Sequence, residues 1–166
     1  MFYQNFLNKL IKTFTIIFFS HLFVVSSFAA GGGGDDSKQM NVKSNYYYKA
    51  VKLINKNSYQ AAIDNLLKAE KTNKKDADLY NYLGFSYRKI GNLEKASQYY
   101  NKALEISPKH KGALEYQGEM FLTQGNLEKA EANLKKLKKI CYLGCKEEKM
   151  LKESIMKYNK GQKSSY

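Results

Sequence analysis

A repeated hexapeptide is the feature that most restricts the fold of this chain. The letters Gly-Asn-Leu-Glu-Lys-Ala occupy residues 91–96 and return at residues 125–130, a separation of 34 residues. Self-similarity at this period is typical of stacked helical hairpins, in which one hairpin cannot bury its apolar face without its neighbours. The sequence therefore predicts an all-α array whose unit is a pair of helices.

The 34-residue period can be followed along most of the chain. After the last repeat, an apolar stripe among lysines and glutamates predicts one more helix, which would cap the array. The expected units are three repeats at 43–76, 77–110 and 111–144 and a capping helix at 145–158.

The middle repeat shows the helical pattern most clearly. Its first helix carries residues at i, i+3, i+4 and i+7 on one stripe, namely Tyr80, Leu83, Gly84 and Tyr87. The missing side chain at Gly84 lets the second helix approach closely. Gly91 supplies a left-handed exit from the first helix, and Asn92 is placed to cap the second.

This pattern resembles the tetratricopeptide repeat (TPR). The matching positions are Tyr80-x-x-Leu83-Gly84-x-x-Tyr87, followed by Ala96, Tyr100, Ala103 and Pro108. The resemblance covers residues 43–144. It implies an α-solenoid of three antiparallel helix pairs, with a concave groove lined by the first helix of each pair.

The resemblance also implies a function and a set of site residues. TPR arrays bind segments of other proteins, so the expected function is a non-enzymatic adaptor or scaffold that holds a partner's peptide segment. The groove positions are Tyr47, Val51, Ile54, Asp78, Asn81, Phe85, Arg88, Glu115, Glu119 and Leu122. The carboxylate clamp of some TPR domains needs lysines and asparagines on these faces. Tyr47 and Val51 occupy the first-repeat places instead, so such a clamp is not expected. Two alternatives remain: a self-associating structural module, and a lysine-rich binder of an anionic surface or polymer.

The net charge of +13 invites a nucleic-acid or membrane reading. Arg88 is the single arginine, and lysine lacks the planar fork that contacts phosphate and guanine in a bidentate way. Specific nucleic-acid binding is therefore not favoured. Seven lysines gather near the end of the array, and a solvated face is favoured over a membrane contact there. They are Lys135, Lys136, Lys138, Lys139, Lys146, Lys149 and Lys152.

No catalytic, metal or cofactor site is expected. His110 lies between two lysines, and no motif places a nucleophile near it. Glu115 and Glu119 are one helical turn apart, a spacing that suits paired carboxylates but that is also common on ordinary helix faces. The sequence argues against an enzyme.

Cys141 and Cys145 are the only cysteines. A structural disulfide bond that fastens the capping helix is favoured. Free thiols and a redox or metal role stay open as alternatives, although the spacing is one residue longer than Cys-x-x-Cys and no histidine lies nearby.

The N-terminal residues have the pattern of an export signal. Lys9 and Lys12 precede an apolar stretch that ends in a small-x-small cleavage site. We expect a signal peptide at 1–29 that is cut after Ala29, with an uncleaved anchor as the rival interpretation. A Gly-rich linker at 30–42 and a disordered tail at 159–166 would flank the array. The mature protein would then be periplasmic.

Overall fold

The regular structure of the described residues is entirely helical. The structure is a computed structural model that describes residues 43–162. The expected signal peptide, the linker and the last four residues of the expected tail lie outside the described residues. The helices, in chain order, are α2 (Asn45–Asn55), α3 (Tyr59–Glu70), α4 (Ala77–Lys89), α5 (Leu93–Ile106), α6 (Lys111–Thr123), α7 (Leu127–Ile140) and α8 (Lys146–Asn159).

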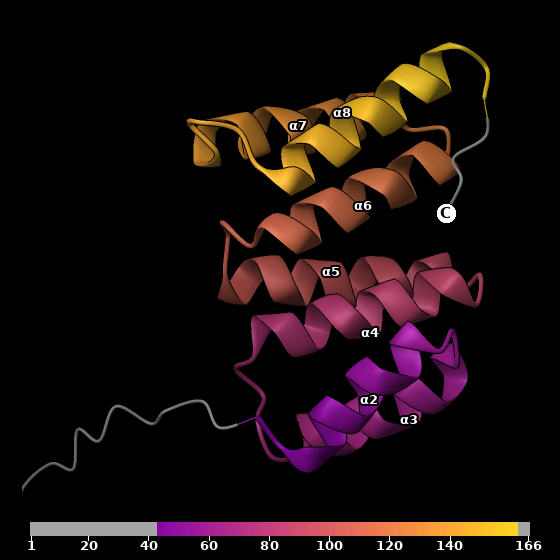
Figure 1. The fold of residues 1–166 in the computed structure, drawn as a ribbon, viewed down its shortest axis with the longest axis vertical. Coiled ribbons are helices and arrows are strands. Elements are labelled where there is room, and N and C mark those ends of the chain that lie inside the picture. Colours follow the sequence, from indigo (N-terminus) through magenta and orange to yellow (C-terminus); the bar gives the residue numbers. More distant parts are fainter. Residues whose placement is uncertain (1–42, 163–166) are drawn as a thin grey trace, which may run out of the picture. The chain divides into compact units, whose positions relative to one another are not determined.

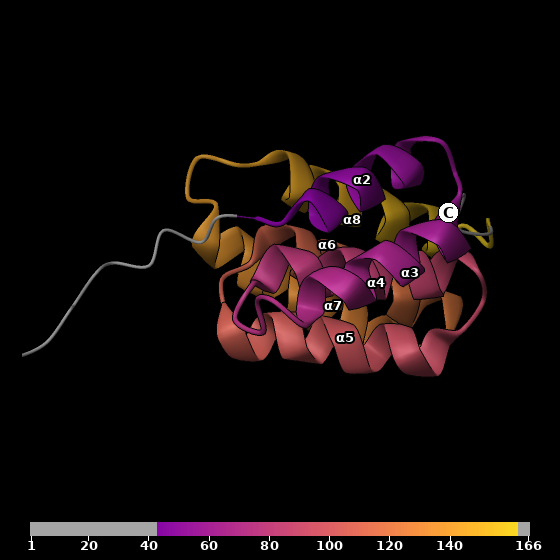
Figure 2. The same ribbon diagram turned by 90° about the horizontal axis from the view of Figure 1, so that it is seen from below.

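The helices form three hairpins and one additional C-terminal helix, as predicted (Figure 1). In each hairpin the two consecutive helices, α2 with α3, α4 with α5 and α6 with α7, make extensive contacts. The first helices also touch one another in sequence, because α2 contacts α4, α4 contacts α6, and α6 contacts α8. Figure 2 shows α2, α6 and α8 toward one side and α5 toward the other. The first helices thus form one continuous face.

The repeated hexapeptide forms the turn within each of the last two hairpins. Gly91 and Gly125 have φ values of 82° and 74°, a left-handed conformation that glycine adopts without steric cost. The side chains of Asn92 and Asn126 accept hydrogen bonds from the backbone N–H groups three residues later, at 3.0 and 3.1 Å. Asn57, with φ of 58°, takes the left-handed position in the first hairpin. The turn chemistry expected from the sequence is therefore confirmed.

Two glycines within the first helices allow different close approaches. A Cβ atom at Gly84 would lie 2.6 Å from ring atoms of Tyr100, on the second helix of the same hairpin. A Cβ atom at Gly118 would instead lie 2.6 Å from Leu151, on α8. Gly84 allows the two helices of one hairpin to pack closely, and Gly118 allows α8 to pack closely against α6.

Two hydrophobic clusters divide the core. One spans the first two hairpins and reaches α6, and the other lies between the last hairpin and α8. Leu104 and Phe121 pack against both clusters, so the core continues from hairpin to hairpin. Among residues 43–162, no helix combines the length and the apolar character needed to cross a bilayer.

Candidate partner-binding face of the first helices

The ten residues predicted for the groove lie on α2, α4 and α6, but most of them are covered. Val51 and Phe85 are partly exposed, and Asp78 is exposed. The others pack between helices, and their role in partner binding stays a prediction. These seven buried residues are Tyr47, Ile54, Asn81, Arg88, Glu115, Glu119 and Leu122.

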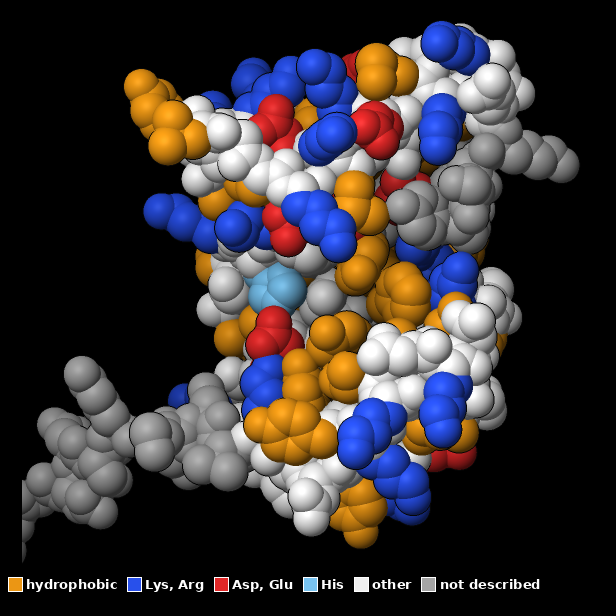
Figure 3. Space-filling view, in the orientation of Figure 1, with side chains coloured by type: hydrophobic (Ala, Val, Ile, Leu, Met, Phe, Trp, Pro, Cys, Tyr) orange, Lys and Arg blue, Asp and Glu red, His pale blue; other side chains and the backbone are white. Residues whose placement is uncertain are grey.

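Tyrosines at one repeat position offer more accessible surface on this face. Tyr48, Tyr82 and Tyr116 are separated by 34 residues and lie on α2, α4 and α6. Tyr48 is exposed, and the other two are partly exposed. We call these three tyrosines together with Phe85 the aromatic row. Figure 3 shows hydrophobic side chains gathered in the middle of this face, over α2, α4 and α6.

Ring contacts hold the aromatic row in place. The ring of Phe85 lies 4.9 Å from that of Tyr116 and 6.0 Å from that of Tyr59, measured between centroids. Tyr82 contacts the buried Tyr47 at 5.9 Å. Such tilted and edge-on pairs favour fixed ring positions, so the row presents a rigid apolar surface. The groove assignment missed these tyrosines, although their recurrence every 34 residues was a signal that could have found them.

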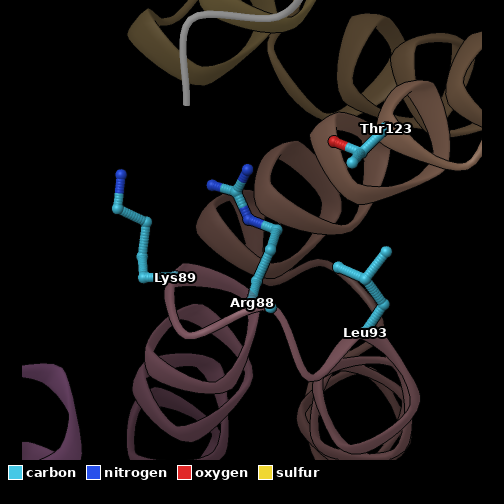
Figure 4. Close-up of a pocket in the computed structure, with 5 residues that line it drawn as sticks. Arg88, Lys89, Leu93 and Thr123 are labelled. Carbon is cyan, nitrogen blue, oxygen red and sulfur yellow. The ribbon is translucent and has the colours of Figure 1, made fainter.

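A small cationic pocket lies near Phe85 of the aromatic row. It has a volume of about 190 Å³ and is lined by Arg88, Lys89, Gly91, Leu93 and Thr123. Figure 4 shows the charged ends of Arg88 and Lys89 extending toward the same side. The Lys89 Nζ also lies 6.0 Å from the centroid of Phe85. Small-molecule pockets commonly measure about 300 to 1,000 Å³, so this one suits a single side chain of a partner better than a cofactor.

Buried charges lie behind this surface, between α4, α5 and α6. Burial raises the pKa of Glu115 from 4.5 to about 8; the charge of Glu119 adds to the shift, and Arg88 opposes it. Burial also raises the pKa of Tyr100, against the influence of Arg88. Glu115 and Glu119 are only 2% and 0% exposed, so a substrate cannot reach this carboxylate pair. The cluster lies within the packing of these three helices.

A polar network joins the first helices near their N-termini. Lys43 contacts the carboxylates of both Asp76 and Asp78 and donates to the Tyr47 hydroxyl at 3.0 Å. The Nδ1 atom of His110 accepts a hydrogen bond from the Ala113 N–H at 3.0 Å and thereby caps α6. The proton of the neutral ring is then on Nε2, which donates to Asp78 at 2.9 Å.

Asp78 therefore links the N-terminal ends of the first helices through Lys43 and His110. Burial alone would raise the pKa of Asp78, but the hydrogen bonds from Lys43 and His110 outweigh it and lower that pKa. An aspartate that is paired on two sides gives up existing bonds when it binds a partner. Its place in the predicted groove is thus less favourable for binding than that of Phe85.

The cysteine pair is bonded in the structure. Cys141 and Cys145 form a disulfide bond, with their Cα atoms 5.5 Å apart, between the end of α7 and the start of α8. Within residues 43–162, no group of three or more His, Cys, Asp or Glu side chains is arranged to hold a metal ion.

Comparison with known proteins gives the family. Residues 38–122, half of the chain, match the family described as regulator of microtubule dynamics protein 1-3. The chain belongs to this family. Its repeats are TPR-like, and the TPR fold predicted from the sequence is confirmed by the solved structures that resemble it.

A curated relative and three solved structures illustrate the likeness of this family member. Photosystem I assembly protein Ycf3 of Rippkaea orientalis (strain PCC 8801 / RF-1) is 35% identical over 85 residues, which cover 45% of this chain and 49% of the relative. The chain thus spans about half the length of that protein. The structure of MamA is 32% identical, with a TM-score of 0.52, and the match covers 55% of this chain and 53% of that one.

Two further structures show the fold alone, because their identity to this chain is low. The first TPR domain of Spaghetti (RPAP3), bound to the HSP90 peptide SRMEEVD, is 16% identical; the match covers 70% of this chain and 89% of that one, with a TM-score of 0.62. The translocator chaperone SycD of Yersinia enterocolitica is 18% identical; the match covers 79% of this chain and 96% of that one, with a TM-score of 0.63.

Proposed function

We propose that this protein is a non-enzymatic adaptor that binds an extended segment of another protein along the aromatic row. The observation that carries this proposal is the recurrence of Tyr48, Tyr82 and Tyr116 on three successive first helices. A surface that repeats at a regular interval suits a ligand that extends across several repeats. Rigid aromatic side chains bury a large apolar area on binding and lose little conformational entropy.

The pocket beside Phe85 gives the proposed binding site a preference for a negatively charged group. Lys89 is only partly buried, and its Nζ lies 6.0 Å from the ring centroid of Phe85. An apolar side chain of the partner would rest on Phe85 and Tyr116, and a neighbouring carboxylate would meet Lys89. The preferred segment therefore carries an acidic residue beside an apolar one. That the RPAP3 domain binds a peptide supports this mode of use for the fold, without identifying the ligand of this chain.

We further propose that the adaptor acts in the bacterial cell envelope after export. The N-terminal pattern and the disulfide bond between Cys141 and Cys145 support this location, because disulfide bonds persist in oxidising compartments. We expect the protein recovered from a periplasmic fraction to begin at Ala30, which the intact mass of the purified chain will show. A mass that includes residues 1–29 would contradict cleavage.

Replacement of Phe85 by Ala together with Lys89 by Glu should weaken partner capture by at least about tenfold, the loss typical of a binding hot spot. Both side chains are partly exposed and lie outside the fully buried core, so helicity measured by circular dichroism should not change. The measurement is a quantitative pull-down from envelope extract with immobilised protein. Ile106→Ala, at an exposed apolar position on a second helix, is the matched control and should capture normally.

The pull-down and two further measurements separate the rival functions. Capture that survives the double substitution would place the binding site elsewhere on the molecule. A self-associating module would show a mass in light scattering that grows with protein concentration. A lysine-driven polymer binder would lose affinity steeply with added salt, whereas binding anchored by aromatic residues would lose less.

A further inference from the structure

The disulfide-closed loop between α7 and α8 presents two apolar side chains. The loop contains Tyr142, Leu143 and Gly144 between the bonded cysteines. The N–H of Gly144 donates to the carbonyl of Cys141 at 2.7 Å, so the chain makes a tight turn with Tyr142 and Leu143 at its two corners. Gly144 has a φ of 83°, which completes the turn. A hydrogen bond and a covalent bond thus hold the same loop.

The corner side chains are far more exposed than the other large apolar residues of the described chain. Tyr142 and Leu143 are 92% and 93% exposed, and the next most exposed, Tyr48, reaches 55%. Neither side chain belongs to the two hydrophobic clusters. Exposure of two adjacent apolar side chains to water is unfavourable. We therefore interpret their exposure on this turn as the sign of a partner surface.

Lysines lie on both helices that flank this loop, which we call the apolar tip. Those on α7 and α8 are exposed, and in the described part of the chain none of them has an acidic side chain within 4 Å. Two acidic residues lie close by in sequence, Glu147 and Glu148. Figure 3 shows several lysine side chains over α7 and α8, with acidic side chains among them. The lysines concerned are Lys135, Lys136, Lys138, Lys139, Lys146, Lys149 and Lys152.

We propose that the apolar tip is a docking site for an anionic lipid bilayer. The lysines would face the lipid phosphates, while Leu143 and the ring of Tyr142 would enter the interface between headgroups and acyl chains. Tyrosine suits this depth because its ring is apolar and its hydroxyl stays hydrated. Stable attachment to a membrane surface generally needs both an apolar and an electrostatic contribution, and this end of the molecule supplies both.

The shape of the tip favours a bilayer over a folded protein partner. Two side chains on the corners of a turn project outward and form no concave surface, so they can enter a soft layer without requiring a matching cavity. The disulfide bond restricts the loop before it binds, which reduces the conformational entropy lost on insertion. The tip is separate from the aromatic row, so this inference does not depend on the proposed function.

A single tryptophan can report on insertion, because the chain contains none. In Tyr142→Trp, the emission maximum should shift to the blue when vesicles of equal parts phosphatidylcholine and phosphatidylglycerol are added, and should not shift with phosphatidylcholine alone. Tyr46→Trp, at an exposed position on α2 outside the aromatic row, should show no shift. Equal shifts at both positions, or no shift at Tyr142→Trp, would overturn the proposal.

Binding measured by vesicle co-sedimentation tests the two contributions separately. Tyr142→Ser with Leu143→Ser should weaken binding by at least about tenfold, since both apolar groups are removed. Lys138→Glu with Lys139→Glu should also weaken it by at least about tenfold, because two positive charges that face the anionic surface become negative. The matched control is Lys49→Glu with Lys52→Glu, which makes the same change of net charge at exposed positions of α2.

The outcomes distinguish the apolar tip from general attraction by a basic protein. If both charge variants weaken binding equally, or if the serine variant binds normally, the tip is not the docking site and the proposal fails. Reduction of the disulfide bond should weaken binding of the native protein and leave the weak binding of the serine variant unchanged. Binding that is insensitive to reduction would show that the closed loop is not what docks.

Discussion

Replacement of Glu115 by Gln is expected to stabilise the protein at about pH 9 and to change little at about pH 4. Burial raises the pKa of Glu115 from 4.5 to about 8, with Glu119 adding to the shift and Arg88 opposing it. In the unfolded chain this carboxyl ionises near its ordinary pKa. Between these two values the native state holds a proton that the unfolded state has lost, so the free energy of unfolding falls as the pH rises.

The expected loss in free energy of unfolding follows from the difference between the pKa of Glu115 in the native and in the unfolded chain. One pKa unit corresponds to about 1.4 kcal/mol, so the native chain should lose on the order of 5 kcal/mol from this group as the pH rises from 4.5 to about 8. The loss is absent below about pH 4.5 and complete above about pH 8. The amide introduced by Glu115→Gln carries no charge at any pH, so the variant should avoid the loss.

Urea denaturation of both proteins across this pH range measures the effect. The quantity to compare is the difference in free energy of unfolding between variant and native chain, because other groups titrate in both. Glu94→Gln, the same replacement at an exposed position on α5, is the matched control. A difference for Glu115→Gln that does not grow between about pH 4 and pH 8 would contradict the burial of an uncharged carboxyl at this position.

Replacement of Gly84 by Val should lower the free energy of unfolding by about 3 kcal/mol, at the upper end of the usual cost of overpacking a core. A Cβ atom at this position would lie 2.6 Å from ring atoms of Tyr100. Tyr100 is fully buried, so its ring has no open space into which it can move. Either α4 and α5 separate or the tyrosine leaves its preferred rotamer.

The denaturant midpoint at unchanged slope measures this cost. Gln98→Val is the control, because it introduces the same β-branched residue at an exposed position of α5. Tyr100→Leu, which shortens the opposing side chain, should make Gly84→Val less costly than it is in the native chain. If Gly84→Val costs no more than Gln98→Val, the close approach of the two helices is not a feature of the folded protein.

Much of the fold could be predicted from the sequence because its determinants are local. The turn glycines and the capping asparagines act within a few residues, and the 34-residue period repeats them in register. The accessible part of the candidate site could not be predicted as well. TPR positions identify the face but not its exposed surface, so Arg88 and Glu119 lie buried while the recurring Tyr82 and Tyr116 remain accessible.

By itself, then, the sequence determined the pairs of helices, their turns and the face formed by the first helices, because spacing and local hydrogen bonding specify these. Only the tertiary structure decided how exposed residues at the same repeat position are and which neighbours they contact. Tyr46 and Tyr80 share a repeat position, yet they are 46% and 5% exposed. Gly84 meets Tyr100 of its own hairpin, whereas Gly118 meets Leu151 of α8. The reason is physical: burial depends on which neighbour covers a residue, and each position along the array has different neighbours.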